Sequence, residues 1–285
     1  MNPTLLTRIL RRCAPTLLLA LALLQESNPA QAAIYQVGQT VTNFSLIARR
    51  SFTRPDGTSA PAGSTVRLAD FAGRVVFLEW FAVWCPYCVA AAPQVETGIV
   101  EWYAARGGNP HGVPVLHVAV NQEARSSYQS QTEAFITQQR FAITMNDYDS
   151  TGTNHVRFLF QRSGQPIFVV INGVTNSPTH QPWQLLVNHL GYGDTDFNTE
   201  LASFRALIDT VQPPATQPQL TNARRVGADF EFSFQPQPNR SYRVEASADL
   251  ANWATLRTYP ASTQTILFRD TNAPPPRRFY RAVTP

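Results

Sequence analysis

The feature that most constrains this chain is an apolar run that ends in two cysteines three positions apart. The run from Val75 to Phe81 predicts a buried strand, and Cys85-Pro-Tyr-Cys88 follows it at the start of a predicted helix over 86–106. Proline suits the first helical turn because its missing N–H would be unpaired there. The free N–H groups and the dipole at a helix N-terminus favour a thiolate. Cys85 is therefore expected to be the accessible nucleophile, and Cys88, one turn inside the helix, the less exposed resolving thiol.

Three other interpretations of the cysteine pair stay open. A structural disulfide across a two-residue loop would restrict little chain entropy and would stabilise only weakly. A zinc site would need two or more further ligands, but Cys13 is the one other cysteine and the five histidines are scattered along the chain. The two thiols could also be inert members of the core. The position between a strand and a helix favours redox chemistry over these alternatives.

Residues 1–32 have the pattern of a secretory signal peptide. A stretch with three arginines precedes an apolar run over 13–24, and Ala30-Gln-Ala32 supplies small residues for cleavage. The run is shorter than the ~20 residues that a membrane-spanning helix needs. We therefore expect a mature chain that is periplasmic or secreted and has no stable membrane anchor. Outside the cytoplasm the cysteine pair would meet oxidising conditions, in which a disulfide persists.

The composition indicates a globular protein and gives little reason to propose a nucleic-acid partner. Hydrophobic residues make up 44% of the sequence, which is ordinary for a folded chain. The net charge is +4, and removing residues 1–32, which hold three arginines and one glutamate, leaves +2. A nearly neutral chain lacks the strong basic field that attracts nucleic acid.

The proline-rich residues 211–219 predict a linker between two regions of different construction. In residues 33–210 apolar strands alternate with helical patterns, which predicts an α/β fold with a mixed sheet flanked by helices. In residues 220–285 short alternating strands predict a small all-β sandwich. Before the linker, helices are predicted at 86–106, 130–140, 153–162 and 198–210, and strands at 75–81, 113–120, 167–171 and 184–190. After the linker, strands are predicted at 229–234, 241–246, 265–268 and 279–283.

Residues 75–93 resemble the active-site segment of thioredoxin-like proteins, most closely the exported TlpA-like or redoxin thiol–disulfide oxidoreductases. Trp84 stands directly before the first cysteine, as in that family, and Pro93 matches the proline that kinks the family's active-site helix. The upstream stretch "VRLADFAGRVVFLEW" is similar to the redoxin lead-in. The resemblance covers about residues 36–210 and implies a thioredoxin fold.

The resemblance also implies an activity, which is disulfide exchange with protein thiols and disulfides and with a further redox partner. The redox group would be a disulfide between Cys85 and Cys88, with no other cofactor and no metal. Gln165-Pro166 stands where the family has its cis-proline, before the predicted strand at 167–171. The substrate-binding residues that the resemblance implies are Trp84, Pro86, Tyr87, Gln165 and Pro166.

Several positions depart from related families. Peroxiredoxins have a threonine three residues before their reactive cysteine, where this chain has Ala82, which disfavours a thiol peroxidase-like redoxin. Copper-delivering relatives separate their cysteines by three residues, and here two intervene. Gln165 replaces the threonine or β-branched residue that is more usual before the family's cis-proline, so the direction of electron flow is not fixed by the resemblance.

A single acidic residue, Glu79, interrupts the apolar run six residues before Cys85, where thioredoxins carry a buried acid. Strand alternation places Glu79 and Phe81 on one face of the strand. A carboxyl group buried there should have a raised pKa, because loss of water disfavours its charged form. It could then accept or return the proton of Cys88, which makes Glu79 a predicted catalytic residue. The alternative is a glutamate at an exposed position of the strand.

The last region, with "NRSYRVEASADLANWATLRTYPAS", resembles a fibronectin-III-like module of secreted bacterial proteins and supplies no catalytic residue. Arg277, Arg278 and Arg281 could contact an acidic surface or a glycan, although a solvated basic face is the simpler interpretation. A second hypothesis for the whole chain follows from this region. The chain could be a surface or matrix binding protein in which the cysteine pair forms only a structural disulfide.

Overall fold

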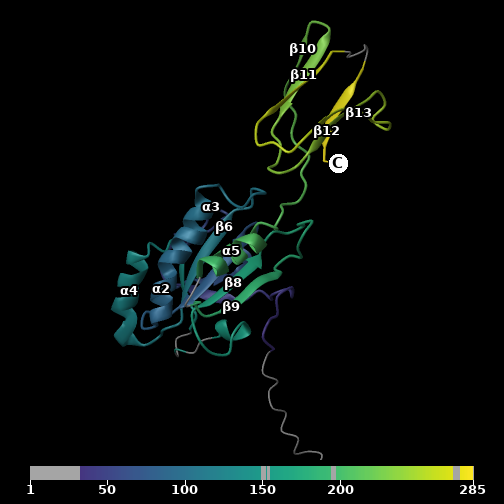
Figure 1. Ribbon diagram of the computed structural model, residues 1–285. Helices are drawn as coiled ribbons and strands as arrows, with labels where there is room; N and C mark the ends of the chain where they lie inside the picture. The colour runs from purple at the N-terminus through teal and green to yellow at the C-terminus, as the bar shows by residue number, and fades with distance from the viewer. Residues whose placement is uncertain (1–32, 149–151, 153–154, 194–196, 272–276, 285) are drawn as a thin grey trace, which may run out of the picture. The chain divides into compact units, whose positions relative to one another are not determined.

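The computed structural model describes residues 33–148, 152, 155–193, 197–271 and 277–284 (Figure 1). The predicted signal peptide, residues 1–32, lies outside the described residues. Among the residues that are described, none of the helices combines the length and the apolar character needed to cross a bilayer.

A seven-stranded mixed sheet has the strand order β4-β1-β7-β6-β5-β8-β9. Strand β5 is parallel to β6 and antiparallel to β8, and β8 is antiparallel to β9. The four strands predicted before the linker are therefore confirmed as the consecutive neighbours β6, β5, β8 and β9. The bounds are β1 Ser45–Ala48, β4 Thr65–Arg67, β5 Val75–Phe81, β6 Val115–Asn121, β7 Thr144–Asn146, β8 Ile167–Asn172 and β9 Leu185–Leu190. The short pair β2 (Phe52–Thr53) and β3 (Ser59–Ala60) forms a separate hairpin.

The helix predicted over 86–106 is present in three consecutive pieces. They are α2 (Pro86–Val95), a π-helical turn η2 (Glu96–Val100) and α3 (Glu101–Ala104). Proline in a helix interior removes one N–H donor and its ring crowds the carbonyl four residues earlier. The π-helical turn begins three residues after Pro93, close to this disturbance of the hydrogen-bond ladder.

The other helices agree with the prediction except for the segment at 153–162. Helix α4 spans Gln129–Gln138 and α5 spans Phe197–Ile208. In place of a helix at 153–162, the described part has a single 3₁₀ turn, Arg157–Leu159. The Asp147 carboxylate accepts hydrogen bonds from the backbone N–H groups of residues 155, 156 and 157. These N–H groups are thus satisfied by a side chain rather than by a helix.

The connectivity β5-α2-β6-α4 followed by β8-β9-α5 is that of the thioredoxin fold that the sequence predicts. One face of the sheet packs against α2 and α5, whose buried residues Val95 and Phe204 share a cluster with Phe77 of β5 (Figure 1). Leu78 and Trp80 point into a separate cluster on the other face. All seven residues of β5 are buried, so the strand that leads to the cysteines is fixed on both faces.

After residues 211–220, which have neither helix nor strand, the chain forms two three-stranded antiparallel sheets, β10-β11-β14 and β13-β12-β15. Phe232 and Phe234 of the first sheet share one buried cluster with Tyr242 and Val244 of the second. The sequence missed β10 and β13, whose residues are mostly exposed and show no apolar alternation. The bounds are β10 Thr221–Val226, β11 Asp229–Phe234, β12 Tyr242–Ser247, β13 Ala254–Tyr259, β14 Ile266–Asp270 and β15 Phe279–Val283.

Candidate active site

Cys85 is the N-cap residue of α2, as the sequence predicts. Its backbone is extended, with φ −89° and ψ 111°, and Pro86 occupies the first turn. The N–H of Cys88 donates a hydrogen bond to Cys85 Sγ over 3.3 Å. This is the geometry in which an N-cap side chain satisfies an N–H group that has no partner inside the helix. Here the capping atom is a sulfur, and both cysteines are free thiols.

The two thiols differ less in exposure than the sequence suggests. Cys88 has no exposed surface, as expected, but Cys85 is only 3% exposed. Both belong to a buried cluster with Phe81 and Ala119. The accessible surface around them is supplied by the neighbouring aromatic residue Trp84, which is 45% exposed, and by Tyr87, which is 51% exposed.

The pKa values of the two thiols are shifted in opposite directions. The pKa of Cys85 falls to about 6, mainly because the Cys88 thiol donates a hydrogen bond to it, with the Cys88 and Tyr87 N–H groups adding to the effect. The pKa of Cys88 is raised far above the ordinary thiol value, first by burial and then by that same hydrogen bond. The negative charges of Cys85 and Glu79 raise it further. One thiol is thus a thiolate at neutral pH and the other stays protonated.

Gln165 lies against Cys85, with Pro166 next to it in the chain, although Gln165 and Cys85 are 80 residues apart in sequence. The Gln165-Pro166 peptide bond is cis. Cys85 Sγ lies 3.9 Å from the Gln165 carbonyl oxygen. Pro166 is buried and its carbonyl accepts from Gly191 N–H over 2.8 Å. The predicted substrate-binding residues therefore lie close to Cys85, with Pro86 and Tyr87 exposed and Pro166 not.

Trp84 is held by two charged residues that sequence reasoning missed. Its indole N–H donates to the buried carboxylate of Glu123, which also forms an ion pair with Arg125 at 2.5 Å. The hydrogen bond from Arg125 is the main cause that lowers the pKa of Glu123. The Arg125 guanidinium lies 5.9 Å from the Trp84 ring and 4.7 Å from the Tyr128 ring. The indole beside the nucleophile is therefore fixed through a charged pair.

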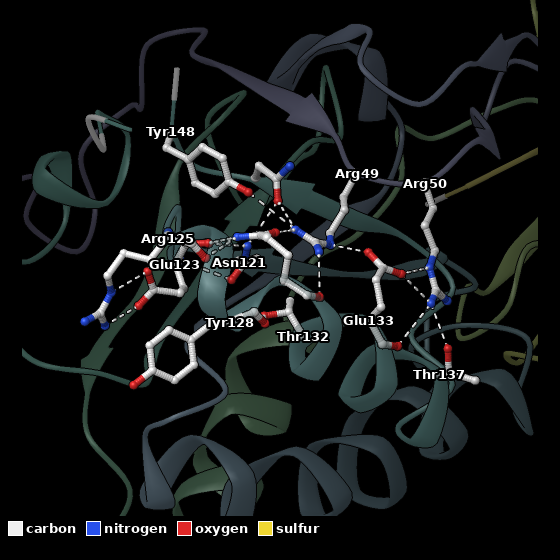
Figure 2. A network of polar contacts seen from close by, with 12 residues as sticks. Arg49, Arg50, Asn121, Glu123, Arg125, Tyr128, Thr132, Glu133, Thr137 and Tyr148 are labelled. Carbon is white, nitrogen blue, oxygen red and sulfur yellow. Dashed lines mark hydrogen bonds and ion pairs between the residues drawn. The ribbon is translucent and has the colours of Figure 1, made fainter. Parts of the chain in front are cut away.

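This anchor belongs to a longer polar network, shown in Figure 2. Asn121 and Gln129 donate to the Glu123 carbonyl oxygen over 3.1 and 3.0 Å. The largely buried Arg49 donates to Gln129 over 2.9 Å and pairs with Glu133 over 2.6 Å. The network links Arg49, which directly follows β1, and helix α4 to the loop after β6, whose Glu123 accepts the hydrogen bond of Trp84. The only sequence signal was the polar stretch at 121–133, which has no fixed spacing that would identify these partners.

Glu79 is buried, so the exposed alternative is wrong. Its side chain has no exposed surface, and Oε2 lies 3.0 Å from Nε2 of His117 on β6. Among the described residues, no group forms a hydrogen bond with the other carboxyl oxygen, Oε1. In the β5–β6 pairing Glu79 stands opposite Ala119, which shares the buried cluster of Cys88. The carboxyl group thus lies close enough to Cys88 to raise the pKa of its thiol.

His117 was not predicted as a site residue, because the histidines are dispersed in sequence. The parallel pairing of β5 and β6 brings it to Glu79, since it precedes Ala119 by two positions and shares its face of the sheet. In the part of the chain that the structure describes, no three His, Cys, Asp or Glu side chains are grouped to bind a metal ion. The groups present are a stabilised thiolate, a protonated second thiol and a buried carboxyl group.

No protein-family model matches this chain, and no curated protein matches it either. Among solved structures, a protein assigned as the thiol:disulfide interchange protein DsbE from Chlorobium tepidum is similar over 62% of this chain and 99% of its own, with 20% identity and a TM-score of 0.41. A protein assigned as a protein disulfide isomerase from Bacteroides thetaiotaomicron is similar over 62% and 93%, with 16% identity and a TM-score of 0.41. The thioredoxin domain of a thiol-disulfide oxidoreductase from Bacteroides vulgatus is similar over 60% and 98%, with 14% identity and a TM-score of 0.38. At these scores the likeness decides nothing about the activity of this chain.

We expect the thiolate of Cys85 to form with a midpoint near pH 6 in the reduced protein. Because the lowered pKa depends mainly on the Cys88 thiol, Cys88→Ala should move the midpoint upward, while Cys88→Ser, which keeps a donor, should move it less. Ultraviolet absorbance of the thiolate during a pH titration measures this, with Cys85→Ser as the blank. A midpoint near the ordinary thiol value of about 8.5 in the unsubstituted protein would contradict the assignment.

Proposed function

We propose that this protein is a thiol–disulfide oxidoreductase that exchanges disulfides with protein substrates through Cys85-Pro-Tyr-Cys88. The observation that carries the proposal is the geometry of the pair: Cys85 caps α2 and accepts the Cys88 N–H on its sulfur over 3.3 Å, and Cys88 is fully buried one turn deeper. The two thiol pKa values shift in opposite directions in accord with this geometry. A thiolate attacks disulfides and a thiol does not, so the lowered pKa selects Cys85 as the attacking group at neutral pH. The raised pKa keeps Cys88 in reserve until a proton acceptor takes its proton.

In the reducing direction the Cys85 thiolate attacks one sulfur of a substrate disulfide. A mixed disulfide forms, and the other substrate sulfur leaves as a thiolate that takes a proton from solvent. Cys88 then gives its proton to the Glu79 carboxylate and attacks Cys85 Sγ, which forms the Cys85–Cys88 disulfide and releases the second substrate sulfur as a thiolate that takes a proton from solvent. A redox partner of the dithiol class would return both cysteines to thiols, and the reverse sequence oxidises a substrate.

The surroundings of Cys85 suit a polypeptide substrate. Trp84, directly before Cys85, and Tyr87, between the two cysteines, present exposed aromatic rings, and Pro86 is exposed as well. Gln165 is half-buried and its carbonyl lies at Cys85. We assign substrate contact to these side chains and to the backbone around the buried Pro166. The anchored Trp84 would offer a fixed surface rather than a mobile one.

The proposal extends to the site of action and to residues 220–285. We propose that residues 1–32 are removed on export, so that residues 33–210 act as the redox domain in the periplasm or outside the cell. The 211–219 linker would join it to a β-sandwich of the fibronectin-III-like kind at 220–285. The two sheets that share one buried cluster support a sandwich. Its role would be to bind a surface or a glycan.

The activity is tested by reduction of insulin with dithiothreitol as the source of electrons. We expect the protein to accelerate insulin reduction, Cys85→Ser to abolish the acceleration, and Cys88→Ser to accumulate a mixed disulfide on Cys85, visible by mass spectrometry. Resolution is then impossible because the second thiol is missing. Acceleration that survives in Cys85→Ser would rule out the proposed function.

Glu79→Gln keeps the shape of the side chain and removes the proton acceptor. We expect resolution of the mixed disulfide by Cys88 to slow by about 10²-fold, the lower end of what general acid–base catalysis contributes, while attack by Cys85 changes little. Rapid quenching in acid during a single turnover with insulin separates the two steps. The matched control is Glu200→Gln, another carboxylate paired with a histidine, His189, at 3.1 Å. Equal resolution rates in the two variants would show that Glu79 has no catalytic part.

A further inference from the structure

A hollow of about 270 Å³ opens in the surface beside β6 and reaches His117. Residues of η2, α3, the start of β6 and the segment after α4 line it, including Glu96, Tyr103, His117 and Arg140. The His117 side chain is only 7% exposed. Its Nε2 lies 3.0 Å from Oε2 of Glu79, whose side chain has no exposed surface.

The hollow and the cysteine pair lie toward opposite ends of β5 and β6. Cys85 follows the carboxyl end of β5, whereas the hollow is lined by Pro114, Val115 and Leu116 at the amino end of β6. The two strands are parallel and in register from Val75 opposite Val115 onward. Glu79 and His117 lie between the two ends, so they connect the underside of Cys88 with a surface that a substrate bound at Cys85 does not occupy.

We propose that His117 carries the proton of Cys88 from Glu79 to solvent in this hollow. Cys88 gives its proton to Glu79, Glu79 gives it to His117 Nε2, and the imidazolium releases it to water or buffer. The chain returns to its starting charges, so no other reactant is needed. This proposal deepens the proposed function, on which it rests, because it adds a proton exit to the same exchange reaction.

The burial of the two thiols explains why the Cys88 proton would leave by a route away from the bound substrate. Cys85 is 3% exposed and Cys88 is fully buried before any substrate binds. A protein joined to Cys85 covers that side further, at the step in which Cys88 must lose its proton. Glu79 has one oxygen on His117 and, within the described residues, no hydrogen-bond partner on the other. Once Glu79 has taken the proton of Cys88, it must pass that proton on before it can accept another one in the next cycle. His117 is the neighbour that its oxygen contacts.

Both charged and aromatic side chains surround His117. Glu79 lies at Nε2 of His117, and Glu96 and Arg140 line the hollow with it. Burial is the main cause that raises the pKa of Glu96, and His117 acts on it in the opposite direction. Phe77 and Phe141 contribute only ring contacts, with centroid distances to His117 of 5.9 and 5.5 Å. Among the described residues, the titratable or charged groups that line the hollow with His117 are Glu96, Tyr103 and Arg140, while Glu79 lies behind it and Glu101 acts on Glu96.

His117→Gln tests the proposal because glutamine can still hydrogen-bond to Glu79 but cannot carry a proton. We expect its resolution step with insulin to be at least about tenfold slower and to lose the pH inflection that a histidine gives near neutrality, while attack by Cys85 is unchanged. His117→Ala should behave likewise and regain its rate when imidazole, which fits the hollow, is added. The matched control is His189→Gln, which removes the other histidine–glutamate pair.

Glu96→Gln tests the same route without touching the buried pair. Loss of this carboxylate should move the pH inflection of the resolution rate to lower pH, because the imidazolium loses a nearby negative charge. If His117→Gln does not fold, this profile decides the matter. Resolution rates and pH profiles in His117→Gln that equal those of His189→Gln, or an unmoved inflection in Glu96→Gln, would overturn the proposal. Insulin reduction that still depends on Cys85 in those experiments would leave the proposed function standing.

Discussion

The burial of Glu79 in the central strand is the constraint on which the site depends. All seven residues of β5 are buried, and a carboxyl group in the middle of such a strand is costly unless a partner compensates it. His117 on the adjacent parallel strand supplies that partner at 3.0 Å. The same strand ends at Trp84 and Cys85, so the packing that fixes the carboxyl group also fixes the start of α2. Stability and chemistry therefore rest on one element.

A division of labour between the two thiols follows from local geometry. Cys85 caps a helix and accepts hydrogen bonds from the Cys88 thiol and N–H, which lowers its pKa. Cys88 lies one turn deeper, and burial and the charge of Glu79 raise its pKa. Trp84 is held separately, by Glu123 and the network that continues to Arg49 (Figure 2). The nucleophile is thus set by the helix, and its aromatic neighbour by the loop after β6.

Much of the fold of residues 33–210 could be predicted because its signals are local. The apolar run, the cysteine spacing and Pro86 predict β5 and the start of α2, and the structure confirms both. His117 and Glu123 could not be found in this way, because they reach the site only through strand pairing and a turn after β6. The strands β1 and β4 were missed for another reason, because three or four residues carry too little periodicity. In the last region, exposed strands such as β10 gave no alternation to recognise.

The reduction potential of the Cys85–Cys88 pair is the most direct test of whether this site exchanges disulfides with substrates or forms only a structural disulfide. It is measured in full-length protein equilibrated with glutathione redox buffers, with the two forms counted after acid quenching and alkylation. Pairs that work in exchange have potentials of roughly −270 to −120 mV, and the stabilised Cys85 thiolate predicts a value within that range. A potential below about −300 mV, at which structural disulfides resist reduction by glutathione, would contradict the account and favour a binding protein with a structural disulfide.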